Sequence, residues 1–162
     1  MEDNMFRQMR RFKQQVTAEE CVRILKSQWR GVLAVIGDGG YPYTIPIDFY
    51  YDEGDGKIYF HGAKEGHKID SIEKCDKVSF CVMDDGFKKD GDWAYTVTSV
   101  VVFGKISRVA DGEKTKEKVC ALASKYNPNP DYVEKEWEGA KNRVLCLELE
   151  IEHMTGKRVH EA

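Results

Sequence analysis

Residues 41–68 read YPYTIPIDFYYDEGDGKIYFHGAKEGHK, and this stretch decides the fold that we expect for the chain. Apolar and polar side chains alternate from Tyr41 to Tyr51, as they do in a strand with one buried face. Residues 52–56 contain the Asp and Gly of a turn, and a second alternating run follows. The pattern predicts a β-hairpin that leads directly into the first turn of a helix.

Two prolines, Pro42 and Pro46, lie on the same side of the first strand of this hairpin. In an antiparallel strand the N–H and C=O of one residue point to one lateral side, and those of the next residue point to the other. Both prolines therefore remove donors from one edge, and the N–H of Thr44 lies on that edge. We expect an unpaired edge, which either serves only to prevent aggregation or offers its free groups to a ligand.

The segment from His61 to Lys68 leaves a strand and enters a helix through Gly62 and Gly66. A helix N-terminus offers unpaired N–H groups and the positive end of a dipole, and Lys68 adds a full charge. This arrangement suits a phosphate monoester, although a solvated turn with surface lysines would have the same sequence. The motif is not GxxxxGK[ST] and opens no βαβ unit, which argues against a nucleoside triphosphate or a Rossmann fold.

An anion site and an unpaired strand edge on one hairpin suit a ligand with a phosphate tail and a flat, hydrogen-bonding head. Flavin mononucleotide (FMN) is such a molecule. We expect its phosphate near Lys68 and its ring edge against the backbone of residues 44–47.

The segments before and after this hairpin supply further strands and a first helix. Thr17 and Glu20 form a capping box for a helix that ends near Gln28. The unbroken apolar run 32–36 predicts a strand buried on both faces. Val78, Phe80 and Val82 mark the next strand. Residues 93–109 form one long β-rich segment, in which we expect a bend near Ser99 or Gly104.

The C-terminal third changes its period and then returns to a strand. Residues 119–126 have helical spacing, and Asn129-Pro130 begins a second helix by cap and first-turn rules. Leucines alternate with glutamates through a last strand, residues 143–152. Short antiparallel links favour a mainly β fold, a curled sheet or small barrel with flanking helices, over a parallel doubly wound sheet.

Composition limits the classes of protein to consider. At 162 residues one domain is expected, and a net charge of −3 with mixed signs favours no nucleic acid partner. Five scattered cysteines without CxxC predict neither a disulfide framework nor a metal site, and they fit a reducing cytoplasm. No apolar run approaches the ~20 residues that span a bilayer, so we expect no membrane contact and a cytoplasmic location.

Several segments together resemble the pyridoxamine 5′-phosphate oxidase-like FMN-binding split barrels. They read PYTIPIDFYY, IYFHGAKEGHKID, VSFCV, TSVVVFGKI and IEHMTGK, in the order and spacing of that family. The chain is most similar to its nitroimidazole-resistance (Nim-type) flavoproteins. The resemblance implies a six-stranded antiparallel Greek-key split barrel and a homodimer with one FMN in each of two interface clefts. It covers a split-barrel domain at 17–162 and leaves residues 1–16 as an N-terminal arm.

The resemblance also implies which residues contact the cofactor. The flavin ring would contact the backbone of Thr44, Ile45, Pro46 and Ile47. The cofactor would be lined by His61, Gly62, Ala63 and Ser99. Its phosphate would contact Gly66, His67 and Lys68. The basic residues that bind phosphate in the true oxidases are only partly matched, and their substrate-binding C-terminal extension is not evident. We therefore do not expect oxidation of pyridoxamine phosphate.

The arm, residues 1–16, is basic and carries Met5, Met9 and Phe12 at helical spacing. Its sequence fits a frayed tail as well as a short amphipathic helix that lies on a partner subunit.

The function that we expect is an FMN-dependent, nitroreductase-like oxidoreductase. Electrons would pass from NADH, NADPH or another reductant to a small acceptor such as a nitroaromatic compound. His61 is the candidate side chain at the reacting face, although a histidine beside a cofactor more commonly packs or hydrogen-bonds. The alternatives are a non-catalytic flavin- or haem-related storage module and a barrel without a cofactor.

Overall fold

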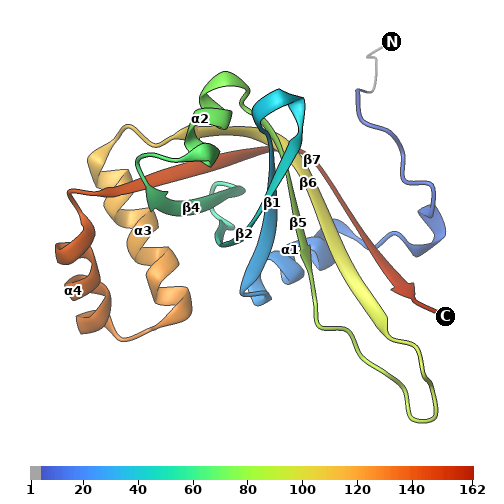
Figure 1. The fold of residues 1–162 in the computed structure, drawn as a ribbon. Helices are drawn as coiled ribbons and strands as arrows, with labels where there is room; N and C mark the ends of the chain where they lie inside the picture. Colours follow the sequence, from blue (N-terminus) through green and yellow to red (C-terminus); the bar gives the residue numbers. More distant parts are fainter. Residues whose placement is uncertain (1–4) are drawn as a thin grey trace.

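A computed structural model describes residues 5–162 as seven strands, four α-helices and two short 3-10 helices (Figure 1). In chain order these are η1 (Phe12–Gln14), α1 (Ala18–Ser27), β1 (Arg30–Ile36), η2 (Asp38–Gly40), β2 (Pro42–Asp48), β3 (Tyr50–Asp52), β4 (Lys57–Ala63), α2 (His67–Lys74), β5 (Lys77–Met83), β6 (Thr96–Arg108), α3 (Gly112–Tyr126), α4 (Pro130–Ala140) and β7 (Val144–His160).

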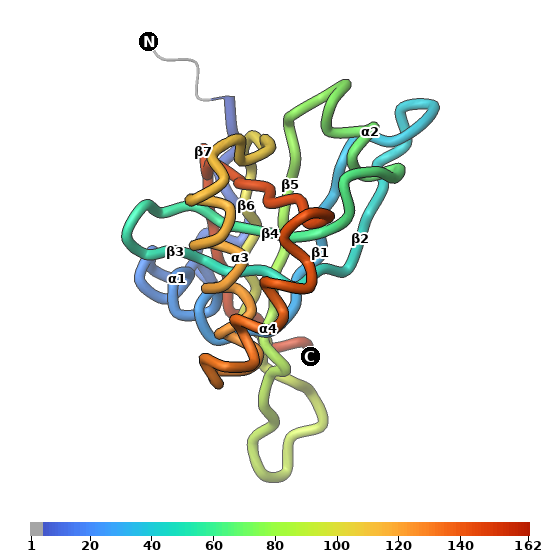
Figure 2. The backbone as a smooth tube through the Cα atoms, turned by 90° about the vertical axis from the view of Figure 1, so that its left-hand side faces the viewer, coloured from blue at the N-terminus to red at the C-terminus, as the bar shows by residue number. Residues whose placement is uncertain are grey.

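All strands belong to one antiparallel sheet in the order β2-β1-β5-β6-β7-β4-β3. The predicted mainly β split barrel is confirmed as a curled half-barrel, whereas the expected number of six strands is wrong. The additional strand arises at Phe49, where the chain stops pairing with β1 and the short β3 begins to pair with β4. Because β2 and β3 are nearly continuous, they join the two ends of the sheet and keep it curled (Figure 2).

The inner face of the curled sheet encloses the main core. Three aromatic side chains that are fully buried lie at its centre, and Phe80 makes edge-to-face contacts with Phe49 and Phe60 at 5.0 and 5.2 Å between ring centroids. Helix α1 adds Ile24 and Leu25, which are also fully buried. Burial of each such side chain contributes about 2–3 kcal/mol, so this cluster is the main source of stability.

Helices α3 and α4 cover the outer face of the sheet at β3, β4 and β7 (Figure 1). The predicted start of α4 is confirmed, because Asn129 accepts a hydrogen bond from the N–H of Asp131 and Pro130 lies in the first turn. Helix α3 begins at an unpredicted cap, where Asp111 accepts hydrogen bonds from two first-turn N–H groups. Beneath α3 the buried Lys118 pairs with Asp52 at 2.5 Å. Because α3 covers this face, Tyr59 of β4 is fully buried against it, whereas its neighbours Ile58 and Phe60 are fully buried in the main core.

Three expectations about the strands and α1 need correction. The strand at 32–36 is buried on one face only, because nothing in the described chain covers its outer face, and Val32 remains 40% exposed. The last strand continues beyond residue 152 to His160, since β6 is long enough to pair with it throughout. The side chain of Thr17 caps α1 as predicted, but Glu20 binds Arg23 and Arg158 instead of reaching back.

The bend predicted in the long β-rich segment is confirmed at Gly104, where the register between β6 and β7 shifts. The strand itself begins at Thr96, three residues later than the segment that we expected.

The N-terminal arm lies along the outer face of its own chain. Phe6 stacks on His153 at 4.8 Å and on Phe103 at 5.6 Å between ring centroids. The amphipathic helix expected from the spacing of Met5, Met9 and Phe12 does not form, and only η1 interrupts the extended chain. Residues 1–4 of the predicted arm lie outside the described residues.

Within residues 5–162, no helix has the length and apolar character needed to cross a membrane. The same residues contain no group of three or more His, Cys, Asp or Glu side chains placed to hold a metal ion.

Candidate functional site

The free edge predicted from the prolines is confirmed. Strand β2 is the last strand at its end of the sheet and pairs only with β1. At the hairpin tip Gly37 N–H donates to the carbonyl of Tyr41 at 2.7 Å, which sets the alternation along the strand. The backbone groups of Pro42, Thr44 and Pro46 consequently point away from β1. The N–H of Thr44 is the one donor that remains between two prolines.

Helix α2 begins directly beside this edge. The ring of His67 stacks on that of Tyr43, with 4.2 Å between centroids and 18° between planes. Its Nε2 accepts a hydrogen bond from the N–H of Asp38 at 3.4 Å. The His67 side chain, expected at a phosphate, thus holds α2 against the β1–β2 hairpin, and its backbone N–H belongs to the open first turn of the helix.

The first turn of α2 carries a lysine, Lys68, that forms no ion pair with any residue from 5 to 162. Gly66 caps the helix with φ of 136°, a conformation that favours glycine. Lys68 is half-buried, and burial alone lowers the pKa of its ammonium group. A Cβ on Gly62 would lie 3.3 Å from Lys68 Nζ, so the glycine lets the lysine ammonium group lie close against the backbone of β4. The free N–H groups, the glycines and Lys68 therefore form an anion cradle, and these residues fit a phosphate.

His61 lies between the free edge of β2 and helices α3 and α4. It borders an open hollow of about 400 Å³ together with Arg30, Pro46, Ile47 and Asp48, which we call the edge hollow. Burial lowers the pKa of the His61 imidazole, and the nearby Asp48 carboxylate opposes this shift. The ring is therefore neutral near pH 7 and can both donate and accept a hydrogen bond.

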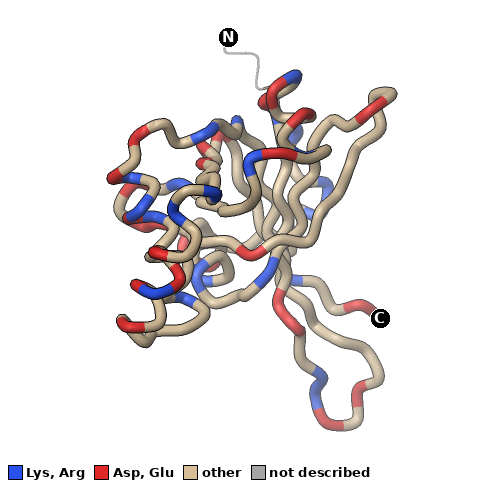
Figure 3. Tube along the Cα trace, turned by 60° about the vertical axis from the view of Figure 1, so that its left-hand side comes forward, with Lys and Arg blue, Asp and Glu red and all other residues tan. Residues whose placement is uncertain are grey.

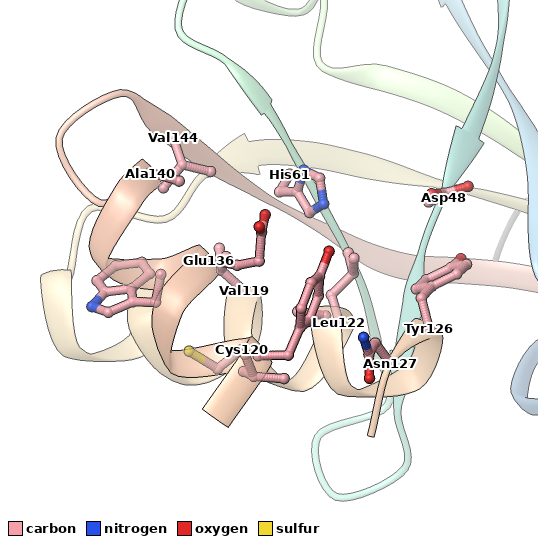
Figure 4. A pocket seen from close by; sticks show the side chains of 14 residues that line it. Asp48, His61, Val119, Cys120, Leu122, Tyr126, Asn127, Glu136, Ala140 and Val144 are labelled. Carbon is pink, nitrogen blue, oxygen red and sulfur yellow. The ribbon is translucent and has the colours of Figure 1, made fainter. Parts of the chain in front are cut away.

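Sequence reasoning missed a second cavity of about 410 Å³, which lies between α3, α4 and β4 and which we call the helical pocket (Figure 4). Its apolar lining includes Val119, Leu122 and Val144, and the Glu136 carboxylate and the His61 ring face the same space. The helical periodicity marked one face of each helix as apolar. No local signal indicated that these faces would lie opposite His61, because that depends on how the helices pack on the sheet.

Most of the predicted site residues come together in one region. Tyr43 of β2 stacks on His67, the first residue of α2, and the next residue, Lys68, lies beside Gly62 of β4. His61, which precedes Gly62, borders the edge hollow together with Pro46 and Ile47 of β2. Ala63 follows as the last residue of β4. Ser99 does not join them: it lies on β6 opposite Met83 and Lys157, and borders a different hollow near the C-terminus.

The sequence matches one protein family and one characterised relative. The sequence model of the family described as pyridoxamine 5′-phosphate oxidase matches residues 17–158. The chain is also similar to the 5a,11a-dehydrotetracycline/5a,11a-dehydrooxytetracycline reductase of Streptomyces rimosus, with 31% identity over 102 residues. That match covers 62% of this chain and 69% of the reductase.

Solved structures share the fold. A proposed 5-nitroimidazole antibiotic resistance protein of Bacteroides thetaiotaomicron has a TM-score of 0.75 and 18% identity, with 89% of this chain and 86% of that chain covered. An FAD-binding protein of Mesorhizobium loti has a TM-score of 0.65 and 22% identity, with 90% and 96% covered. At these identities the similarity concerns the fold alone. Because the family match spans most of its length, the chain belongs to the pyridoxamine 5′-phosphate oxidase family.

Proposed function

We propose that the protein is an FMN-dependent oxidoreductase, with the phosphate in the anion cradle and the flavin ring against the free edge of β2. The observation that carries this proposal is the half-buried Lys68 at the start of α2, which pairs with none of the described carboxylates and lies directly beside an edge whose free donor is Thr44 N–H. A single phosphate suits a cradle with one lysine. The flavin-binding relatives with the same fold support a flavin, and the cradle supports FMN over FAD.

The bound flavin would supply the electron transfer, and the chain's own residues would bind and orient it. Thr44 N–H would donate to the polar edge of the ring and stabilise negative charge there. Pro42 and Pro46 flank it without competing donors, so the edge can meet a ring carbonyl. The neutral His61 would hold a hydrogen bond at the reacting face, where it can give or take a proton.

We further propose NADH or NADPH as electron donor and a small, flat acceptor such as a nitroaromatic compound. Support for reduction as the activity comes from the relative in S. rimosus, which is named as a reductase. Support for a nitro compound comes from the fold shared with the proposed nitroimidazole resistance protein.

The direct test is optical. The purified protein should be yellow, and its visible flavin absorbance should bleach on anaerobic addition of NADH or NADPH. A purified protein that takes up no FMN would contradict the proposal. Bound flavin that neither nicotinamide reduces would favour a non-catalytic flavin-binding module instead.

We also propose that two copies associate through the outer face of β1, β5 and β6. This face presents apolar side chains in register across the strands, and Met83 remains 64% exposed in the single chain. The charged residues of these three strands lie at or near their ends, Arg30 in β1, Lys77 in β5, and Lys105 and Arg108 in β6, whereas the side of the molecule with α3 and α4 is rich in charges (Figure 3). A two-fold partner would cover the apolar face and bring a second Ser99 toward the site.

Val101 lies centrally on this face, opposite Cys81 and Thr155. In a two-fold interface Val101→Glu would introduce two unpaired charges, so we expect the dimer dissociation constant to rise at least tenfold. Analytical ultracentrifugation over a range of concentrations measures this. Lys135→Glu, on the exposed side of α4, is the control and should leave the dissociation constant unchanged. A chain that is monomeric before any substitution would refute the interface.

A further inference from the structure

The helical pocket opens toward the proposed flavin. It shares two lining residues, Asp48 and His61, with the edge hollow, where the flavin ring is proposed to lie. The two spaces therefore meet at these side chains, which come from different strands (Figure 4). A molecule in the helical pocket would have one end at His61 and the rest between α3 and α4.

The size and lining of the helical pocket favour an aromatic ligand. Its volume of about 410 Å³ lies in the range of sites for drug-sized molecules, roughly 300–1,000 Å³. Aliphatic side chains of both helices form its walls, and Trp137 and Tyr132 add aromatic surface. Flat rings pack well against such walls.

The charges of the pocket all have one sign. Among the residues that line it, only Asp48 and Glu136 are acidic, and no Lys or Arg lines it. Asp48 is 2.9 Å from Arg30 Nε, so its charge is partly compensated. Glu136 pairs with no cation of the described residues, and it reaches toward His61 in Figure 4. A free carboxylate above an apolar floor attracts a cation or a strong hydrogen-bond donor.

We propose that the helical pocket is the acceptor site of the oxidoreductase and that it takes an aromatic or polycyclic molecule carrying a cationic or hydrogen-bond-donating group. The assignment of this pocket as the acceptor site rests on the proposed oxidoreductase function. The binding preference itself follows from the pocket and does not require a flavin.

Three naphthalene probes of equal size and different charge test the preference: 1-naphthylmethylamine, 1-naphthylmethanol and 1-naphthoate. Calorimetric titration into the full chain at pH 7, with and without FMN, should rank the amine first and place it at least tenfold ahead of the carboxylate. Glu136→Gln should reduce the preference for the amine over the alcohol by about three- to tenfold. Glu134→Gln removes the same charge from the same helix, but Glu134 lies outside the pocket and pairs with Lys116 at 3.7 Å, so the preference should not change.

A second variant fills the space. Ala140 lines the pocket and is half-buried, so Ala140→Trp should abolish binding of all three probes while the chain keeps its FMN content and its circular dichroism spectrum. Probe binding that survives Ala140→Trp, or a carboxylate that binds as tightly as the amine, would overturn the inference. Failure of the chain to bind FMN would refute the proposed function, while the titration without FMN would still report on the pocket.

Discussion

Reversal of the charge at Lys68 is expected to weaken FMN binding about a hundredfold. A hydrogen-bonded lysine–phosphate contact contributes about 1.5–3 kcal/mol, and Lys68→Glu replaces this attraction with repulsion at the same place. Each 1.4 kcal/mol changes the dissociation constant tenfold. Lys68→Met, which keeps the length of the side chain and removes only the charge, should cost about tenfold. Flavin fluorescence quenching during titration of the apoprotein measures both dissociation constants.

Lys74→Glu provides the matched control for this charge reversal. Lys74 lies in the last turn of the same helix, is exposed, and faces no part of the anion cradle. Its reversal should change FMN affinity by less than threefold, since exposed charges are screened by solvent. Equal losses for Lys68→Glu and Lys74→Glu would mean that the phosphate lies elsewhere.

The affinity for FMN should also depend on pH through Lys68. The protonated ammonium binds the phosphate, so affinity should fall as pH rises through the pKa of this lysine. Burial lowers that pKa, and the fall should therefore begin at a lower pH than an ordinary lysine would produce. In Lys68→Met this part of the pH dependence should disappear.

The second large effect concerns stability, at the bulge between β6 and β7. A Cβ on Gly104 would lie 2.0 Å from the backbone carbonyl oxygen of Glu150, a distance that no rotamer change can relieve. The two strands must separate locally, within the longest paired region of the sheet. We expect Gly104→Ala to lower the free energy of unfolding by about 3 kcal/mol or more, measured by urea denaturation at fixed protein concentration.

Gly139→Ala is the control for Gly104→Ala. Gly139 lies in α4, and its added methyl group would have no atom within 4 Å. Alanine favours a helix over glycine by about 1 kcal/mol, so this variant should be slightly more stable than the parent chain. If Gly104→Ala unfolded at the same urea concentration as the parent, the bulge would not require glycine.

Local rules predicted much of the fold and some of the geometry of the candidate site. The cap at Asn129 and the bend at Gly104 involve neighbours within a few residues, and both occur where they were expected. The free edge followed from proline chemistry and the two-residue period of a strand. By contrast, the side-chain role of His67 was not predictable, because its partners Tyr43 and Asp38 lie on a hairpin that is distant in sequence.

Contacts between distant segments decided the remaining features. Phe49 N–H donates to the Tyr126 hydroxyl across 77 residues of sequence, and contacts of this kind fix α3 beside β4 and so create the helical pocket. The exposed outer face of β1 likewise depends on which elements cover it, which the apolar run 32–36 does not encode. The stretch from Tyr41 to Lys68 by itself determined a free edge and a helix start with a cation, because backbone direction and caps act locally. Only the tertiary structure placed the two side by side, since packing between α2 and the hairpin joins them.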